Sequence, residues 1–178
     1  GLGVVPKLII VKNTAVVEGW STYHASIGNT GALRLDTTSA EITDAKFWND
    51  TSPTSSLFTV GNGTEVNGSG NVMIAYCFSE IAGYSKFGIY TGNGSSTGDG
   101  SFINTGFKPA FIMVKRTNGT KNWHIFDTTR STSNLTKADL KPNLNVAEDT
   151  SNDWLDILSN GFKWRIASGD ADYADVNG

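Results

Sequence analysis

Two sets of aromatic and polar side chains have the chemistry to bind a sugar, because a pyranose ring offers an apolar face to a flat indole and a polar rim to hydrogen-bonding groups. The first set is Trp20, Tyr23 and His24, and the second is Trp123, His124, Asp127 and Arg130. Alternate residues of an extended strand share one face, so Trp20, Thr22 and His24 should point together, and so should Trp123, Ile125 and Asp127. A third site is the segment FWNDTSPTSS, expected to form a loop or a short helical turn. The candidate ligand-binding residues are Trp20, Tyr23, His24, Trp48, Trp123, Asp127 and Arg130.

A core role is the alternative for these aromatic residues. Trp20 and Trp123 lie 103 residues apart at equivalent points of two similar segments, and a tryptophan that recurs in this way often anchors a core. The sequence alone leaves both roles open.

The acidic residues do not form a catalytic pattern. Glycosidases hold two carboxylates across a cleft, whereas Glu41, Glu80 and Glu148 are scattered along the chain. A zinc-binding helix motif and a phosphate-binding glycine loop are also missing from the sequence. We therefore expect a non-enzymatic protein, with a glycoside hydrolase as the alternative if a carboxylate pair lies about 5–10 Å apart in a cleft.

Metal and redox chemistry are also not expected. Asp170, Asp172 and Asp175 lie close together, but their spacing differs from that of a calcium-binding EF-hand loop, so a solvated acidic turn is the simpler interpretation. Calcium remains the one cofactor worth testing. Cys77 is the only cysteine and lies in an apolar segment, which indicates an inert buried thiol.

The overall charge limits the partners. The formal net charge is −3 and the basic residues are not clustered, which argues against a nucleic-acid partner. Neither a membrane-spanning run nor a signal peptide is visible, so we expect no membrane insertion. A start at Gly1 without methionine indicates a piece of a longer protein.

Strands must position these side chains, because the chain is rich in turn-forming residues and has no long amphipathic helical pattern. Residues 72–92 contain the longest apolar run and predict a central hairpin of two strands, 72–79 and 84–91. Bulky residues alternate with small ones in the first strand, which predicts that both of its faces are covered. Residues 152–159 predict one or two helical turns, with Asp153 as the cap.

An internal repeat organises the chain. Pro6, Lys12 and Trp20 recur 103 residues later as Pro109, Lys115 and Trp123, and the offset grows to 107 further along, as loops of variable length permit. We predict an all-β, single domain over residues 1–178, built from half-repeats 1–105 and 106–178, whose apolar faces pack as a two-sheet antiparallel sandwich. The second half-repeat ends before its last strand, which predicts an open sheet edge and a possible homo-oligomer.

Residues 84–130 and 158–165 resemble a repeated domain of marine bacteriophage tail and other virion structural proteins. The most specific segments are 86–94, from KFG to NG, and 106–109, GFKP. The resemblance implies a concanavalin A-like lectin fold of the jelly-roll type, a virion or extracellular location, and attachment rather than catalysis. The expected partner is a cell-surface carbohydrate or, for a purely structural assembly module, other virion subunits.

Overall fold

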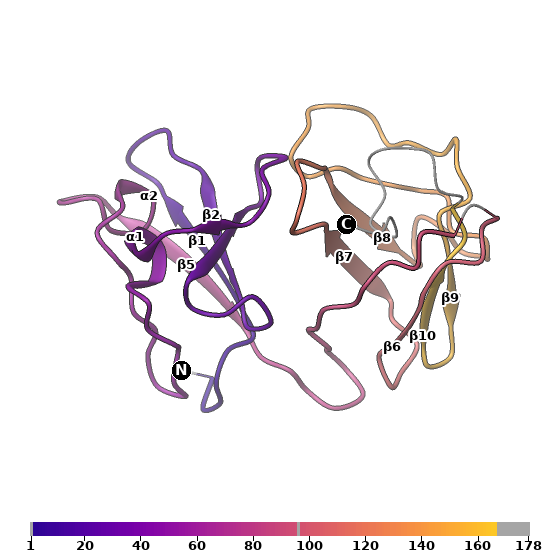
Figure 1. Cartoon of the computed structure of the whole chain (residues 1–178), viewed down its shortest axis with the longest axis horizontal. Helices are drawn as coiled ribbons and strands as arrows, with labels where there is room; N and C mark the ends of the chain where they lie inside the picture. Colours follow the sequence, from indigo (N-terminus) through magenta and orange to yellow (C-terminus); the bar gives the residue numbers. More distant parts are fainter. Residues whose placement is uncertain (1, 96, 167–178) are drawn as a thin grey trace. The chain divides into compact units, whose positions relative to one another are not determined.

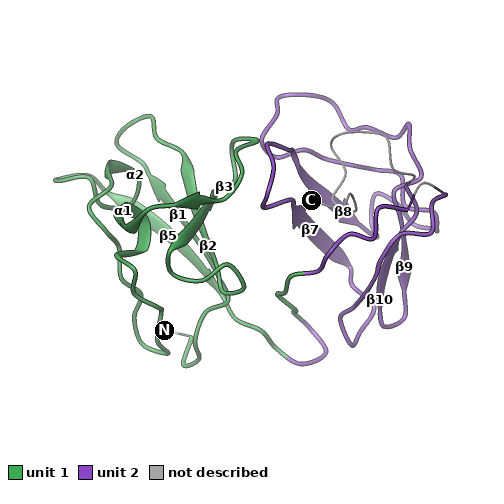
Figure 2. Cartoon of the chain, viewed as in Figure 1, with its two compact units in different colours: residues 1–81, 85–89 green, residues 82–84, 90–178 purple. Residues whose placement is uncertain are grey.

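Antiparallel strands make up most of the regular structure of the computed structural model, which describes residues 2–95 and 97–166. This confirms the all-β class. The chain divides into two compact units, residues 1–81 with 85–89, and residues 82–84 with 90–178 (Figure 2). The predicted boundary between the half-repeats, after residue 105, lies further along the chain than this division. The difference arises because residues 102–104 supply a strand to the second unit. That the two units form one sandwich domain stays a prediction.

The first unit contains a five-stranded sheet in the order β4-β3-β2-β1-β5, of which β1, β2 and β5 are labelled in Figure 1. Two four-residue helices, α1 (Ala45–Trp48) and α2 (Thr64–Asn67), accompany the sheet. A core of alternate strand residues, including Ile9, Val11 and Tyr23, packs with the aromatic residues of α1. The strands are β1 (Leu8–Asn13), β2 (Trp20–His24), β3 (Gly31–Arg34), β4 (Ile42–Thr43) and β5 (Met73–Phe78).

The apolar segment in the middle of the sequence forms an edge strand. β5 confirms the first strand predicted there, but it pairs only with β1 in the described sheet, and residues 84–91 form no strand, so the predicted central hairpin is wrong. Met73 and Cys77 pack on the core, and burial raises the pKa of the Cys77 thiol. The bulky residues of β5 lie on its other face and are exposed. The prediction that both faces of this strand are covered is therefore wrong for the face that carries the bulky residues.

The second unit contains a three-stranded sheet, β6-β10-β9, and a two-stranded sheet, β7-β8. Residues 155–158 are extended, so the helical turns predicted over 152–159 are wrong. The reason is alternation: Leu155 and Ile157 enter the core of the unit, whereas Asp156 lies on the opposite face of the strand. The strands are β6 (Phe102–Asn104), β7 (Phe111–Lys115), β8 (Trp123–Asp127), β9 (Leu155–Leu158) and β10 (Gly161–Trp164).

The first hairpin of each unit has the same register at the offset seen in the sequence. Leu8 lies opposite His24 in β1 and β2, and Phe111 lies opposite Asp127 in β7 and β8, 103 residues further on. The ammonium of Lys12 donates to the carbonyls of Asn13 and Glu18, both at 2.8 Å. The ammonium of Lys115 likewise donates to carbonyls of its own hairpin loop, those of Arg116 at 2.6 Å and Gly119 at 3.3 Å. The recurring lysine thus closes the loop in each copy.

The environment of Lys115 predicts a pH-dependent stability. Burial, with the nearby charge of Arg116, lowers the pKa of Lys115 from 10.5 to about 8. Between these two values the unfolded chain binds a proton that the folded chain has released, so the free energy of unfolding rises with pH. We expect the rise, on the order of 1 kcal/mol after solvent screening, to be absent from Lys115→Met.

Urea unfolding on either side of pH 9 measures this rise, and Lys12→Met is the matched control, which should keep it. Equal pH dependence in the wild type and Lys115→Met would contradict the prediction.

Candidate functional site

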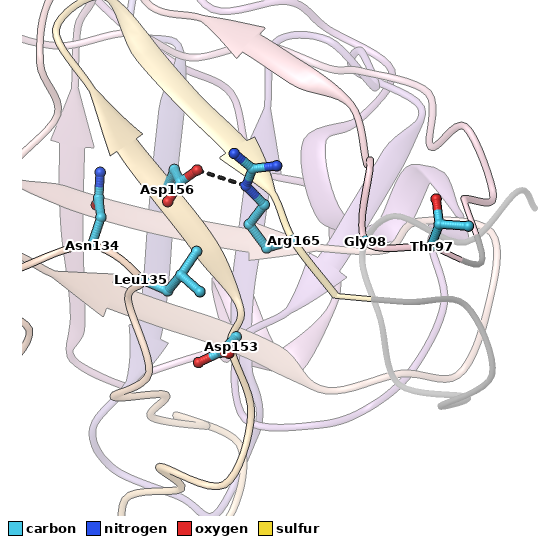
Figure 3. Close-up of a pocket in the computed structure, with 7 residues that line it drawn as sticks. All are labelled: Thr97, Gly98, Asn134, Leu135, Asp153, Asp156 and Arg165. Carbon is cyan, nitrogen blue, oxygen red and sulfur yellow. Dashed lines mark hydrogen bonds and ion pairs between the residues drawn. The ribbon is translucent and has the colours of Figure 1, made fainter.

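An open hollow of about 500 Å³ in the second unit is the candidate site (Figure 3). Three segments that are distant in the sequence contribute to it: the loop before β6, the loop before β9, and the β9-β10 hairpin with its flanking residues. Its lining is mostly polar. The lining residues are Thr97, Gly98, Asn134, Leu135, Asp153, Asp156 and Arg165.

The β9-β10 hairpin positions the charged pair of the hollow. Asp156 in β9 lies opposite Lys163 in β10, and the backbone N–H of Arg165 donates to the carbonyl of Trp154 at 2.8 Å, extending the hairpin by one step. Because neighbouring residues alternate between faces, Trp164 is buried in the core. Arg165 Nε therefore lies 2.6 Å from Asp156 Oδ2, on the face away from the core.

Two further features hold the loops that line the hollow. The side-chain amide of Asn134 donates to the carbonyl of Ile157 at 3.1 Å and accepts from its N–H at 2.9 Å, which holds this loop against β9. Gly98 has a φ of +78°, and a Cβ on it would lie 2.6 Å from the carbonyl oxygen of Arg165. Only glycine lets the loop approach the end of β10 so closely.

The hollow has the chemistry of a site for a neutral polyhydroxylated ligand. The carboxylates of Asp153 and Asp156 accept hydrogen bonds, the guanidinium of Arg165 donates several, and Thr97 does both. Leu135 adds a small apolar surface. Lys137 Nζ pairs with Asp153 at 2.9 Å on the exposed rim, which leaves a balanced set of charges around the opening.

Three of the residues predicted to bind a ligand are buried. Tyr23 and Trp48 belong to the core of the first unit, where their rings meet edge to face with centroids 5.8 Å apart. The indole of Trp48 donates to the carbonyl of Gly31 at 3.1 Å, from a helical position that confirms the predicted turn. Burial raises the pKa of Tyr23. Trp123 is also buried. These positions favour the core role that the sequence left open.

Trp20 and His24 lie on the opposite face of the first sheet and are only half-buried. Trp20 stacks with the exposed Tyr76 of β5 at a centroid distance of 6.4 Å. His24 lies 6.5 Å from the ring of Phe87, its Nδ1 accepts the N–H of Ser26, and burial lowers its pKa. These are the predicted aromatic residues whose rings still reach solvent.

Asp127 and Arg130 come together as predicted, but they bind each other and the backbone. Arg130 Nε lies 2.6 Å from Asp127 Oδ2, and Nη1 lies 2.6 Å from Glu148 Oε2. The remaining donors reach the carbonyls of Ala138 and Ile125. Backbone N–H donation from Arg130, its guanidinium and the N–H of Thr129 lower the pKa of Asp127. The geometry is that of a structural clip.

A buried polar cluster in the second unit resembles catalytic machinery in composition only. His124 Nδ1 lies 3.1 Å from both carboxylate oxygens of Asp139, and Lys141 Nζ lies 3.1 Å from the same carboxylate. Burial opposes the charge of Lys141, but Asp139 and Asp149 outweigh it and raise its pKa. His124 and Asp139 are each 1% exposed, so a substrate cannot reach them.

Sequence reasoning missed the hollow because its residues come from segments up to about 70 positions apart. The one local signal was the alternation of apolar and polar residues in LDILSNGFKWR. Interpretation of residues 152–159 as helical turns hid that signal.

The buried cluster predicts a large effect for one carboxylate. Asp139→Asn should destabilise the second unit by about 3 kcal/mol, because it removes a buried carboxylate from His124 and leaves the partly buried Lys141 only the more distant Asp149, at 3.5 Å. Asp153→Asn is the matched control: its partner Lys137 and Asp153 are both exposed, so the loss should stay below about 1 kcal/mol. Urea unfolding, monitored by amide exchange in β8, measures the loss of stability in both variants. Equal losses would contradict the prediction.

The comparisons with known proteins give one match. A family model described as a domain of unknown function (DUF7483) matches residues 1–175. No curated protein and no solved structure matches the chain.

Within residues 2–95 and 97–166, none of the helices has the length and apolar character needed to cross a membrane. The same ranges contain no group of three or more His, Cys, Asp or Glu residues that could hold a metal ion. Asp170, Asp172 and Asp175, the predicted acidic turn, lie outside the described residues.

Proposed function

The chain belongs to the DUF7483 family, a domain of unknown function, and we propose, from the chemistry of its polar hollow, that it binds cell-surface carbohydrate without catalysis. In this proposal it is an attachment module of a virion or tail fibre. The observation that carries the proposal is the polar hollow of the second unit, with an acceptor carboxylate and a donor guanidinium held side by side (Figure 3).

The arrangement in the hollow matches the chemistry of a sugar. Vicinal hydroxyls each donate one hydrogen bond and accept others, so they are best satisfied by a carboxylate next to a guanidinium. The β9-β10 hairpin presents this combination through Asp156 and Arg165, and Asp153 and Thr97 add further polar groups. A volume of about 500 Å³ lies within the range of small-molecule sites.

The openness of the hollow favours weak binding by a single copy. A ligand in a shallow site keeps much of its surface in water, which limits the free energy of binding. Several copies on one fibre would raise the overall affinity through effective concentration. Multivalent attachment is therefore the setting in which such a site becomes useful.

The finer fold belongs to the same proposal. A concanavalin A-like two-sheet sandwich built from related half-repeats is supported by antiparallel pairing throughout, by the repeated hairpin register, and by the resemblance to phage virion domains. The non-enzymatic character rests on the absence of a paired-carboxylate motif from the sequence.

A purely structural assembly module is the second candidate. The observation that favours it is β5, whose bulky residues are exposed on one face, with Tyr76 stacked on Trp20. Burial of such a surface against another virion subunit would stabilise an assembly. In that case the hollow would have no ligand.

A glycan array probed with the protein in multivalent form tests the proposal. We expect reproducible binding, and a loss of at least about tenfold in affinity for Arg165→Ala, equivalent to about 1.4 kcal/mol. Asp153→Asn should weaken binding by a smaller factor. The matched control is Arg116→Ala, because Arg116 is an arginine of the same unit that does not line the hollow.

Two results would contradict this assignment. A blank array with folded protein would favour the structural module. Binding that survives Arg165→Ala but is lost in Trp20→Ala would place the sugar on the aromatic face of β2 and β5 instead.

A further inference from the structure

The outer edge of β7 lacks a neighbour that its counterpart in the first unit has. β1 pairs with β2 on one side and with β5 on the other. β7, which corresponds to β1, pairs with β8, and among the described residues no strand pairs with its other side (Figure 1).

The correspondence extends over four strand positions. In addition to the shared hairpin register, the N–H of Ala25 donates to the carbonyl of Lys7 at 2.8 Å. The N–H of Thr128 donates to the carbonyl of Ala110 at 3.0 Å, and its donor and acceptor each lie 103 residues after those of the first bond. The partners Thr22 and Leu33 of β2 and β3 recur as the bridge between Ile125 and Leu140, at offsets of 103 and 107.

The partners Ala32 and Ile42 recur in the same way, as the bridge between Asp139 and Asp149. The second unit therefore repeats the pairings β1-β2, β2-β3 and β3-β4. The pairing β1-β5 is the one without a counterpart in the described residues.

The backbone groups at this edge point outward. The carbonyl of Ala110 faces β8, since it accepts from Thr128. Because an antiparallel strand directs successive residues to opposite sides, the N–H and C=O groups of Phe111, Met113 and Lys115 face away from β8. The corresponding residues of β1 face β5, as shown by donation from Thr14 N to Val72 O at 3.0 Å.

The first side chain of the edge also lacks cover, whereas those of Met113 and Lys115 are half-buried. Leu8, beside β5, is 7% exposed, whereas its counterpart Phe111 is 59% exposed. The ammonium of Lys115 is turned toward the carbonyls of its own loop, so the edge presents no free charge. β5 is uncharged as well. An uncharged, half-apolar edge of this kind pairs readily with another extended strand.

We infer that the outer edge of β7 is a docking site for an extended, uncharged strand of the β5 type, added by β-augmentation. The register follows from β1 and β5: Phe78 of such a strand lies opposite Phe111, Tyr76 opposite Met113, and Ile74 opposite Lys115. Its small residues face the core of the second unit and its bulky residues face outward, as in β5. This inference does not depend on the proposed sugar site.

A synthetic peptide of residues 71–80, with serine in place of Cys77 and a solubilising lysine tail, tests the site on the full chain. Fluorescence anisotropy of labelled peptide measures affinity, and amide exchange locates the contact. We expect saturable binding and slower exchange of the Phe111, Met113 and Lys115 amides.

Two N-methylated peptides of equal composition provide the control. N-methylation at positions 74 and 76 removes the donors that face the docking edge, because Val72 and Phe78 direct their carbonyls to β1 and alternate residues share a side. That peptide should bind at least about tenfold more weakly. N-methylation at 75 and 77 blocks the opposite edge and should leave binding unchanged.

A substitution in the protein tests the same edge from the other side. Met113→Pro removes an outward N–H without removing a bond to β8, so it should abolish peptide binding, whereas Met113→Ala should retain most of it. Slow exchange of the β8 amides in both variants would show that the hairpin is intact.

Three outcomes would overturn the inference: no binding at millimolar peptide, equal binding of the two N-methylated peptides, or slower exchange at a place other than β7. A concentration-dependent dimer of the chain alone, with β7 protected, would make a second copy the occupant instead of a free strand.

Discussion

The antiparallel pairing of the first hairpin in each unit, β1-β2 and β7-β8, determines which side chains enter the two cores. The register of β1 with β2, repeated in β7 with β8, sends Ile9, Val11 and Tyr23 into one core and Ile112, Val114 and Phe126 into the other. A slip of one residue would exchange the two faces, so the apolar pattern and the loop lysine must agree on one register. Lys12 and Lys115 meet that requirement by donating to carbonyls of the loop that follows each of them.

The same alternation builds the candidate site. Leu155, Ile157 and Trp164 enter the core of the second unit, and this leaves Asp156 and Arg165 together on the opposite face. The hollow is therefore the outward face of the hairpin that supplies a large part of the core. Asp156 lies within β9, and Arg165 follows β10 and is held by its backbone bond to Trp154, so the ordering of this pair requires little further entropy on binding.

In the two units, the carboxylate that pairs with a cation on the inner face of the sheet comes from different elements. At three matched positions of the inner face, the first unit has Ser21, Ala32 and Arg34, and the second has His124, Asp139 and Lys141. In the first unit the acid comes from α2, where Glu65 Oε1 lies 2.5 Å from Arg34 Nη2. In the second it comes from the sheet itself. A buried cation needs an anion nearby, but the fold leaves open which element supplies it.

Local pattern in the sequence was enough to predict the β class, the repeat and the alternation within the first hairpin, because each depends on residues close together in the chain. It also indicated a loop or a short helical turn at Trp48, and the structure has the helical turn. It could not tell a strand from a helical turn at residues 155–158, since a short apolar run fits both until its partner is known. The partner, β10, resolved the choice.

Only the tertiary structure decided which aromatic residues are buried and which polar residues meet. Trp20 and Trp123 occupy equivalent sequence positions, yet one is half-buried and the other is buried, because burial depends on what packs against a strand face. The residues around the hollow come from three separate segments, and their meeting is set by strand pairing over long sequence separations. Periodicity carries information about faces, whereas contacts between distant segments arise only once the faces have packed.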